Sequence, residues 1–293
     1  MPIKVLSSQL LTKIIGAKSN DSDIILHLNE SSGTGTGWGD RSIYSNGASF
    51  TGNVSFNRGL ITNGINTTPS YAQGTLTSDP GNNFTISVTF EVYGNSQDTV
   101  FQTIFTSMNN LIGNPPASEG FILGYYDNQS SPTNTVRFFY GISGDYISLP
   151  ANSVPFNTKT TFTVSWNGSN FKLYLDGVLQ STTPITTTFT FTNKNYRVGY
   201  WFSSYPRSLN GKVYDVILYN RTLSDQEVQD LYFKKPTGLN VSANSGELLV
   251  RSNRVLYVDA SVPSSYTSGV SFYDLSGNAL NGVISRNNGT GNL

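Results

Sequence analysis

The 293-residue chain has no cysteine, a single histidine and only 12% charged residues. Without cysteine it can form neither a disulfide scaffold, nor a thiol nucleophile, nor a cysteine-ligated zinc or iron–sulfur site. Its 18 basic and 18 acidic residues cancel, which excludes a polybasic nucleic-acid binder because phosphate binding requires a surplus of Lys and Arg. No apolar run approaches the roughly 20 residues of a membrane-spanning helix. We therefore expect neither a nucleic-acid partner nor membrane insertion.

The chain is instead rich in Ser, Thr and Asn, around an apolar content of 37% with 13% aromatic residues. This apolar content suffices to bury a core. The first apolar stretch is broken by Ser, Gln, Thr and Lys, so it lacks the unbroken apolar region of a secretory signal peptide. We expect a soluble, β-rich protein that is made in a cytosol. The zero net charge also predicts that partner binding depends little on ionic strength.

Residues 1–22 are predicted to form an N-terminal arm. Leu6, Leu10 and Ile14 recur at helical spacing over about two turns, and a polar stretch follows at 18–22. A segment this short is not stable alone. It either packs on its own domain as a frayed end, or it anchors the chain in another protein or another copy of itself. The second alternative predicts an oligomer.

From Ile24 to Phe233 the dominant pattern is alternation with period two. The apolar Ile86, Val88 and Phe90 alternate with Ser and Thr, which predicts a strand with one apolar face and one wet face. Comparable segments, separated by Gly, Asn and Pro, recur at 120–126, 136–140, 161–166, 171–175, 196–201 and 213–219. Many short strands of this kind predict an antiparallel two-sheet sandwich.

Two local motifs predict a turn and a helix. Asp176-Gly177 joins two short strands and tolerates the positive φ angles of a type I′ turn. Ser224 and Glu227 form a capping box, in which the Ser224 hydroxyl accepts from the Glu227 amide and the Glu227 carboxylate reaches back. The helix is predicted to pack Val228 on the sandwich and to end before Lys234.

Two segments carry a family resemblance. Residues 166–178 read WNGSNFKLYLDGV and resemble the central hairpin of laminin G-like, concanavalin A-like jelly rolls. Residues 209–227 read LNGKVYDVILYNRTLSDQE and are similar to the last strand and terminal helix of that family. The resemblance implies an all-β fold over 23–235: an antiparallel two-sheet jelly-roll sandwich with one short C-terminal helix. Because the family includes lectins, glycosidases, adhesion modules and virion proteins, it does not by itself assign an activity.

A linker is predicted at 236–250, and residues 251–293 are predicted to be a partial second jelly-roll domain. An apolar segment at 25–28 (ILHL) is followed by an aromatic residue and an Asp-x-Ser turn at 38–42 (WGDRS). The same order recurs at 256–259 (LYVD) and 272–278 (FYDLSGN). The second copy has no central hairpin, and so short a segment cannot close a sandwich. We expect the natural polypeptide to continue past Leu293, or a neighbouring subunit to supply the missing strands.

The sequence shows no familiar catalytic or metal-binding pattern. Its glutamates contain no E-x-D-x-E pattern of the kind that glycosidases of this fold use, and Glu91 is expected to be a solvated strand residue. The lone His27 cannot build a metal triad and is expected to be a strand residue with a satisfied ring nitrogen. Asp40 and Asp79 offer oxygens that suit calcium, but Asp is equally favoured in turns, and Asp40 and Asp274 are predicted to cap turns. We expect no cofactor and no enzyme activity, although a lyase that uses Tyr and Arg would leave no such signature.

The best candidate for ligand recognition is the loop over 199–210. It holds Trp201, Tyr205, Arg207 and Asn210 in a polar, Ser- and Pro-containing stretch. Sugars stack on aromatic rings while Asn and Arg reach their hydroxyls, and this loop offers both. The alternative is that Trp201 belongs to the core at the end of a strand. Secondary candidates are Trp38, Tyr125 and Tyr126.

Taken with the resemblance, these features look like a virion surface protein, such as a tail fibre or capsid-decorating fibre. It would assemble with other virion proteins or copies of itself through residues 1–22 and present jelly rolls to host surface glycans. One alternative is a bacterial extracellular carbohydrate-binding or adhesion module. A second is a polysaccharide-degrading enzyme with an unrecognised site.

Overall fold

The computed structural model describes residues 22–65, 67–78, 80–96, 101–107, 120–128, 131–140, 145–185, 189, 191, 194–201, 207–234, 271–272 and 282–283. The predicted linker and all of the predicted arm except Ser22 lie outside these residues. The chain divides into two compact units, residues 1–238 and 239–293, and each is described by itself.

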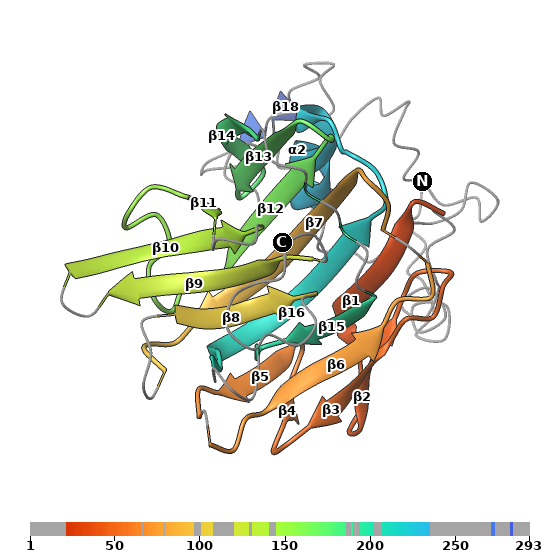
Figure 1. The fold of residues 1–293 in the computed structure, drawn as a ribbon, viewed down its shortest axis with the longest axis vertical. Coiled ribbons are helices and arrows are strands. Elements are labelled where there is room, and N and C mark those ends of the chain that lie inside the picture. Colours follow the sequence, from red (N-terminus) through yellow and green to blue (C-terminus); the bar gives the residue numbers. More distant parts are fainter. Residues whose placement is uncertain are drawn as a thin grey trace, which may run out of the picture. The chain divides into compact units, whose positions relative to one another are not determined.

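The strands of the first unit, β1 to β16, belong to one antiparallel sheet (Figure 1). Its main path runs β11-β10-β9-β8-β15-β6-β3-β2-β1-β16-β7-β12-β13-β14, and β5 pairs with both β16 and β4. The strands are β1 (Ile24–Gly33), β2 (Gly37–Asp40), β3 (Ala48–Thr51), β4 (Ser55–Phe56), β5 (Leu60–Asn63), β6 (Tyr71–Thr75), β7 (Phe84–Val92), β8 (Phe101–Thr106), β9 (Ile122–Asn128), β10 (Ser131–Phe139), β11 (Tyr146–Ser148), β12 (Thr160–Trp166), β13 (Asn170–Leu175), β14 (Val178–Pro184), β15 (Asn195–Val198) and β16 (Asn210–Tyr219).

This path folds back on itself, so that its two halves face each other across one core. The β9 layer contains β6, β15, β8, β9, β10 and β11, and the β7 layer contains β1, β16, β7, β12, β13 and β14. The ring of Phe84 in β7 stacks 5.3 Å from that of Phe121 beside β9, and Phe138 of β10 lies 5.0 Å from Phe171 of β13. All four side chains are fully buried. The predicted all-β, antiparallel sandwich is confirmed, and β3 and β2 join β6 of one layer to β1 of the other in one continuous ladder.

Both local motifs form as the sequence predicts. Asp176 and Gly177 take φ angles of 49° and 79° in the turn between β13 and β14. The Ser224 amide donates to Glu227 Oε2 at 2.8 Å, and the Glu227 amide donates to Ser224 Oγ at 3.3 Å. These bonds begin helix α2 (Asp225–Lys234), which ends one residue later than predicted.

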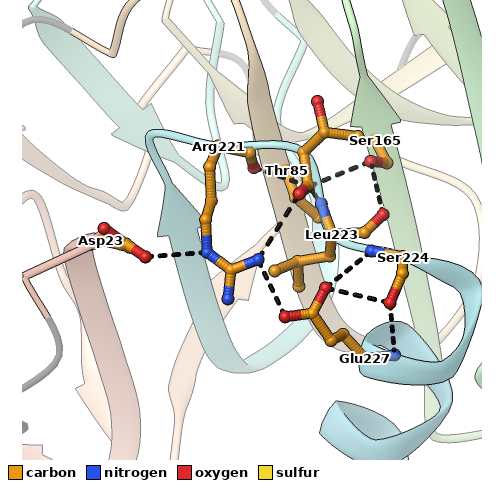
Figure 2. Close-up of polar contacts among 8 residues, drawn as sticks. Asp23, Thr85, Ser165, Arg221, Leu223, Ser224 and Glu227 are labelled. Atoms are coloured by element: carbon orange, nitrogen blue, oxygen red, sulfur yellow. Dashed lines mark hydrogen bonds and ion pairs between the residues drawn. The ribbon is translucent and has the colours of Figure 1, made fainter.

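Helix α2 packs on the outer side of the β7 layer. Leu223, Val228 and Leu231 form a buried cluster with side chains of β1, β13 and β16. Figure 2 shows how Arg221 ties this helix to the start of β1. Its Nε donates to Asp23 Oδ2 at 2.8 Å, and its Nη1 lies 2.9 Å from Glu227 Oε1. The helix is therefore held by an apolar cluster and by ion pairs at its first turn.

In the second unit the described residues form a two-stranded antiparallel sheet. It pairs β17 (Ser271–Phe272) with β18 (Gly282–Val283). Asp274 and the rest of the predicted second jelly roll lie outside the described residues, so the predictions for 251–293 stay predictions.

Candidate functional site

The outer side of the β9 layer carries two rows of side chains that cross β8, β9, β10 and β11. Directly paired residues point to the same side of a sheet, and the core-facing row lies between these two. The first outward row is Thr103, Gly124, Arg137 and Ser148. The second is Thr106, Ile122, Phe139 and Tyr146. Thr103, Thr106 and Ile122 are buried, so the accessible part of this face lies at β10 and β11, where strand alternation brings aromatic and cationic side chains together.

An aromatic platform lies at the β10–β11 side of this face. The guanidinium carbon of Arg137 lies 3.4 Å from the ring centroid of Tyr126 and 4.3 Å from that of Tyr146. Phe139 extends the group, with its ring 5.1 Å from that of Phe101 and 5.3 Å from that of Tyr146. Tyr146 is 46% exposed, whereas Phe101 is buried and supports the others. We define the platform as these five residues.

A second aromatic group lies on the same outward side at β6 and β15. The rings of Tyr71 and Tyr200 stack 5.0 Å apart, and the guanidinium carbon of Arg197 lies 5.4 Å from the Tyr71 centroid. Arg197 pairs with Thr106 and therefore points outward with the second row. Its Nη1 donates to the Trp201 carbonyl at 3.0 Å. Three interstrand steps, about 14 Å, separate its strand from β10.

Of the four residues predicted for ligand recognition, the structure describes three. Trp201 is partly exposed beside Arg197, and the Arg207 carbonyl accepts from the Thr103 amide of β8 at 3.2 Å. The Asn210 side chain is engaged elsewhere, because its Nδ2 donates to the Asn95 carbonyl at 3.1 Å. Tyr205 lies outside the described residues. The loop therefore borders the outward face, and Asn210 anchors a neighbouring loop.

Two of the three secondary candidates belong to the core. Trp38 is 1% exposed and donates its Nε1–H to the Asn29 carbonyl at 2.8 Å, and Tyr125 is fully buried. Tyr126, which points the other way along β9, is part of the platform. The sequence analysis missed Arg137, Phe139 and Tyr146. The signal was present in residues 136–140, where aromatic and cationic side chains fill the positions that alternate with core residues.

The arginines of the outward face are electrostatically unlike those of the β7 layer. Among the described residues, no carboxylate pairs with Arg137 or Arg197, and the Arg137 Nε is buried without a hydrogen-bond partner. Burial also lowers the pKa of the nearby Arg207 guanidinium from its usual value. In contrast, four cations of the β7 layer and its loops lie within 4.0 Å of a carboxylate: Arg58 and Lys159 of Glu30, Lys172 of Asp225, and Arg221 of Asp23 and Glu227. Lys212 of β16 instead lies 4.5 Å from the ring centroid of Tyr214.

The carboxylates of the β7 layer are engaged in structural contacts. Glu91, expected to be solvated, accepts the Tyr214 hydroxyl at 2.6 Å, and burial together with this contact raises the pKa of Tyr214. Asp40 accepts the amides of His27 and Ser42 and so caps its turn, as predicted. His27 Nε2 lies 3.5 Å from Asp215 Oδ1.

Within the described part of the chain, no three side chains of His, Cys, Asp or Glu are grouped so that they could hold a metal ion. The same residues contain no helix with the length and apolar character needed to cross a membrane.

Sequence comparison places this fold in a family. The profile of the concanavalin A-like lectin/glucanases superfamily (Laminin_G_3) matches residues 62–229, which is more than half of the chain. The chain belongs to this superfamily. Its matched segment runs from β5 into α2 and includes all of the aromatic platform. No curated protein sequence matches the chain significantly.

Solved structures share the fold of this concanavalin A-like chain at low identity. The binding domain of botulinum neurotoxin serotype D/C superposes with a TM-score of 0.55 and 15% identity, over 72% of this chain and 52% of the other. Domain 4 of an extracellular arabinanase from Geobacillus stearothermophilus, solved with arabinotriose, superposes with a TM-score of 0.51 and 16% identity, over 72% of this chain and 98% of that domain. A Trypanosoma rangeli sialidase superposes with a TM-score of 0.54 and 18% identity, over 72% of this chain and 32% of the sialidase. The chain thus spans about half of the toxin domain and a third of the sialidase.

Proposed function

We propose that this concanavalin A-like chain is a non-enzymatic glycan-binding module whose binding surface is the outward face of the β9 layer. The observation that carries the proposal is the aromatic platform, which presents the rings of Tyr126, Phe139 and Tyr146 around one guanidinium. Rings of this kind stack on the apolar faces of sugars, while Arg donates to their hydroxyls. The related arabinanase domain, which was solved with arabinotriose, supports a saccharide ligand.

The surface on which Tyr146 lies also suits recognition better than catalysis. Its two outward rows contain no carboxylate from Thr103 to Ser148. The glutamates that the structure describes on the β7 layer are held by Arg58, Tyr214 and Ser224. Most glycosidases hydrolyse the glycosidic bond with a pair of carboxyl groups that flank it.

A glycan array with matched variants tests the binding site. Tyr146→Ala should weaken binding by about tenfold or more, as is typical of a central aromatic contact. Tyr93→Ala, which removes a 39% exposed tyrosine next to β7, should bind like the parent. Equal losses in both variants, or no glycan binding by the parent chain, would overturn the proposal. A reducing-end assay after incubation with the bound oligosaccharide tests the enzymatic alternative, since a rise in reducing ends would make the chain a hydrolase or lyase.

For the biological setting we propose a virion surface protein, a tail fibre or capsid-decorating fibre, with a bacterial extracellular module as the second candidate. The family resemblance and the glycan-binding surface support a protein that meets cell-surface sugars. An antibody against the first unit should label purified virus particles in electron micrographs. Labelling of bacterial cell surfaces in uninfected cultures would instead favour the second candidate.

A further inference from the structure

We infer that the glycan bound by the outward face is acidic, with a carboxylate that Arg137 recognises. This inference rests on the proposed function and adds the ligand's charge. The starting point is the state of Arg137 itself. It lies between the rings of Tyr126 and Tyr146, makes no ion pair with a described residue, and keeps a buried Nε without an acceptor.

An arginine that is partly buried and has no carboxylate partner is stabilised when it binds an anion. The two rings replace part of the water around the guanidinium, and burying a charged donor without a partner is costly. The same rings restrain the orientation of the planar guanidinium group, so that less side-chain conformational entropy is lost when a ligand binds. A carboxylate that approaches the two Nη groups in the guanidinium plane would accept two parallel, charge-assisted hydrogen bonds from them, while the Nε stays buried. Arg137 is thus arranged for a planar anion more than for a neutral hydroxyl.

The outward face carries a second arginine, Arg197. Arg197 points outward about 14 Å away across the strands, with one hydrogen bond to a backbone carbonyl and no described carboxylate partner. The cations in the ion pairs of the β7 layer are neutralised locally. The zero net charge of the whole chain therefore coexists with two arginines on this face that have no carboxylate partner among the described residues. For this face we expect binding that weakens with salt, in contrast to the expectation from net charge alone.

The two arginines lie at separate places on the outward side. Side chains about 14 Å apart laterally cannot both reach one monosaccharide ring. Thr103, Thr106 and Ile122, which lie between the two arginines on the outward side, are buried, so the exposed ring of Tyr146 marks the contact surface at Arg137. An oligosaccharide with acidic units along its length would place one carboxylate at Arg137 and stack on the exposed ring of Tyr146 beside it.

The test compares one saccharide in two charge states. Hexa-galacturonate and its methyl ester differ only in their carboxylates, and binding of each to the full chain is measured by calorimetry at low and moderate salt. The acid should bind at least tenfold more tightly at low salt and lose that advantage as salt rises. Arg137→Gln should remove the advantage, and Tyr146→Ala should weaken both ligands. The matched Arg58→Gln, which changes an exposed arginine in the turn between β4 and β5, should leave both unchanged.

Each outcome separates this inference from the proposed function. Equal binding of acid and ester, or an acid preference that persists in Arg137→Gln, overturns the acidic ligand but leaves the glycan-binding face in place. Failure of both saccharides to bind, together with a glycan array without hits, overturns both. Tight binding of a single-stranded oligonucleotide that Arg137→Gln abolishes, without saccharide binding, would assign the face to a different polyanion and overturn the inference.

Discussion

Replacing Gly177 with alanine tests how tightly α2 packs against the β13–β14 hairpin. Gly177 has a φ of +79°, and a Cβ at this position would lie 2.8 Å from Tyr232 Cβ of the helix. An alanine in the left-handed region costs about 1–2 kcal/mol. Overpacking against an atom fixed close to the backbone adds about 1–3 kcal/mol. We therefore expect Gly177→Ala to lower the free energy of unfolding by about 2–5 kcal/mol.

The chain offers a matched control for the backbone part of this cost. Gly81 has a φ of +80°, and a Cβ there would meet nothing within 4 Å. Gly81→Ala should therefore lose only the backbone contribution of about 1–2 kcal/mol. Urea denaturation of both variants, followed by far-UV circular dichroism, gives the difference directly. For a domain of this size each kcal/mol should also lower Tm by about 2–4 °C.

The comparison refutes the packing argument if the two variants lose equal stability. Equal losses would mean that Tyr232 moves away from the new methyl group at no cost in free energy, and that α2 packs loosely on the hairpin. A change in the denaturant slope of Gly177→Ala alone would indicate instead that the helix separates from the hairpin before the sandwich unfolds.

Three further predictions follow from the core, a turn and the helix terminus. Phe84→Ala, at a fully buried ring that contacts Phe121, should cost about 3–5 kcal/mol in urea denaturation, while the exposed Val178→Ala should change stability by less than about 0.5 kcal/mol; a small loss at Phe84 would contradict the facing-layer core. Asp40→Ala leaves the amides of His27, Ser42 and Asn46 without their acceptor and should cost about 3 kcal/mol or more, whereas Asp40→Asn should retain part of that stability. The hydrogen bonds from Lys172 and Tyr174 lower the pKa of Asp225, so its contribution is present above the unfolded pKa of about 4 and disappears as the pH falls through the lower folded value. Asp225→Asn should thus be less stable at pH 7 and lose less Tm than the parent between pH 5 and pH 2, and parallel Tm profiles would disprove this linkage.

The elements that follow from local rules could be predicted from the sequence. Period-two alternation locates β7 and β12, the Asp176-Gly177 pair predicts its turn from φ preferences alone, and the capping box predicts the start of α2. Each depends on neighbours within a few positions. The order of the strands in the sheet cannot be predicted from such neighbours, because β16 pairs with β1, β5 and β7, which are distant in sequence.

The candidate site could be predicted less well for the same reason. The loop holding Trp201 stands out in sequence because its aromatic and polar residues are consecutive. The platform is assembled from β8, β9, β10 and β11, so that Arg137 meets Tyr126 and Tyr146 only through strand register. A one-residue shift of that register would turn Arg137 toward the core. Sequence patterning showed which side chains alternate but not which strands are neighbours.

The position of β16 between β1 and β7 also constrains the order in which the chain can fold during synthesis. Asp23 directly precedes β1 and Arg221 follows β16. These two residues form an ion pair, although they are 198 positions apart in the sequence. At the usual elongation rate of about 5–20 residues per second, the ribosome needs about 10–40 s to deliver the second after the first. Throughout this interval β1 lacks its partner in the β7 layer and exposes unpaired backbone groups that other strands can capture. The nascent chain is therefore most vulnerable to misassembly before residue 219 emerges, and slowed translation late in the message should increase aggregation more than slowed translation at its start.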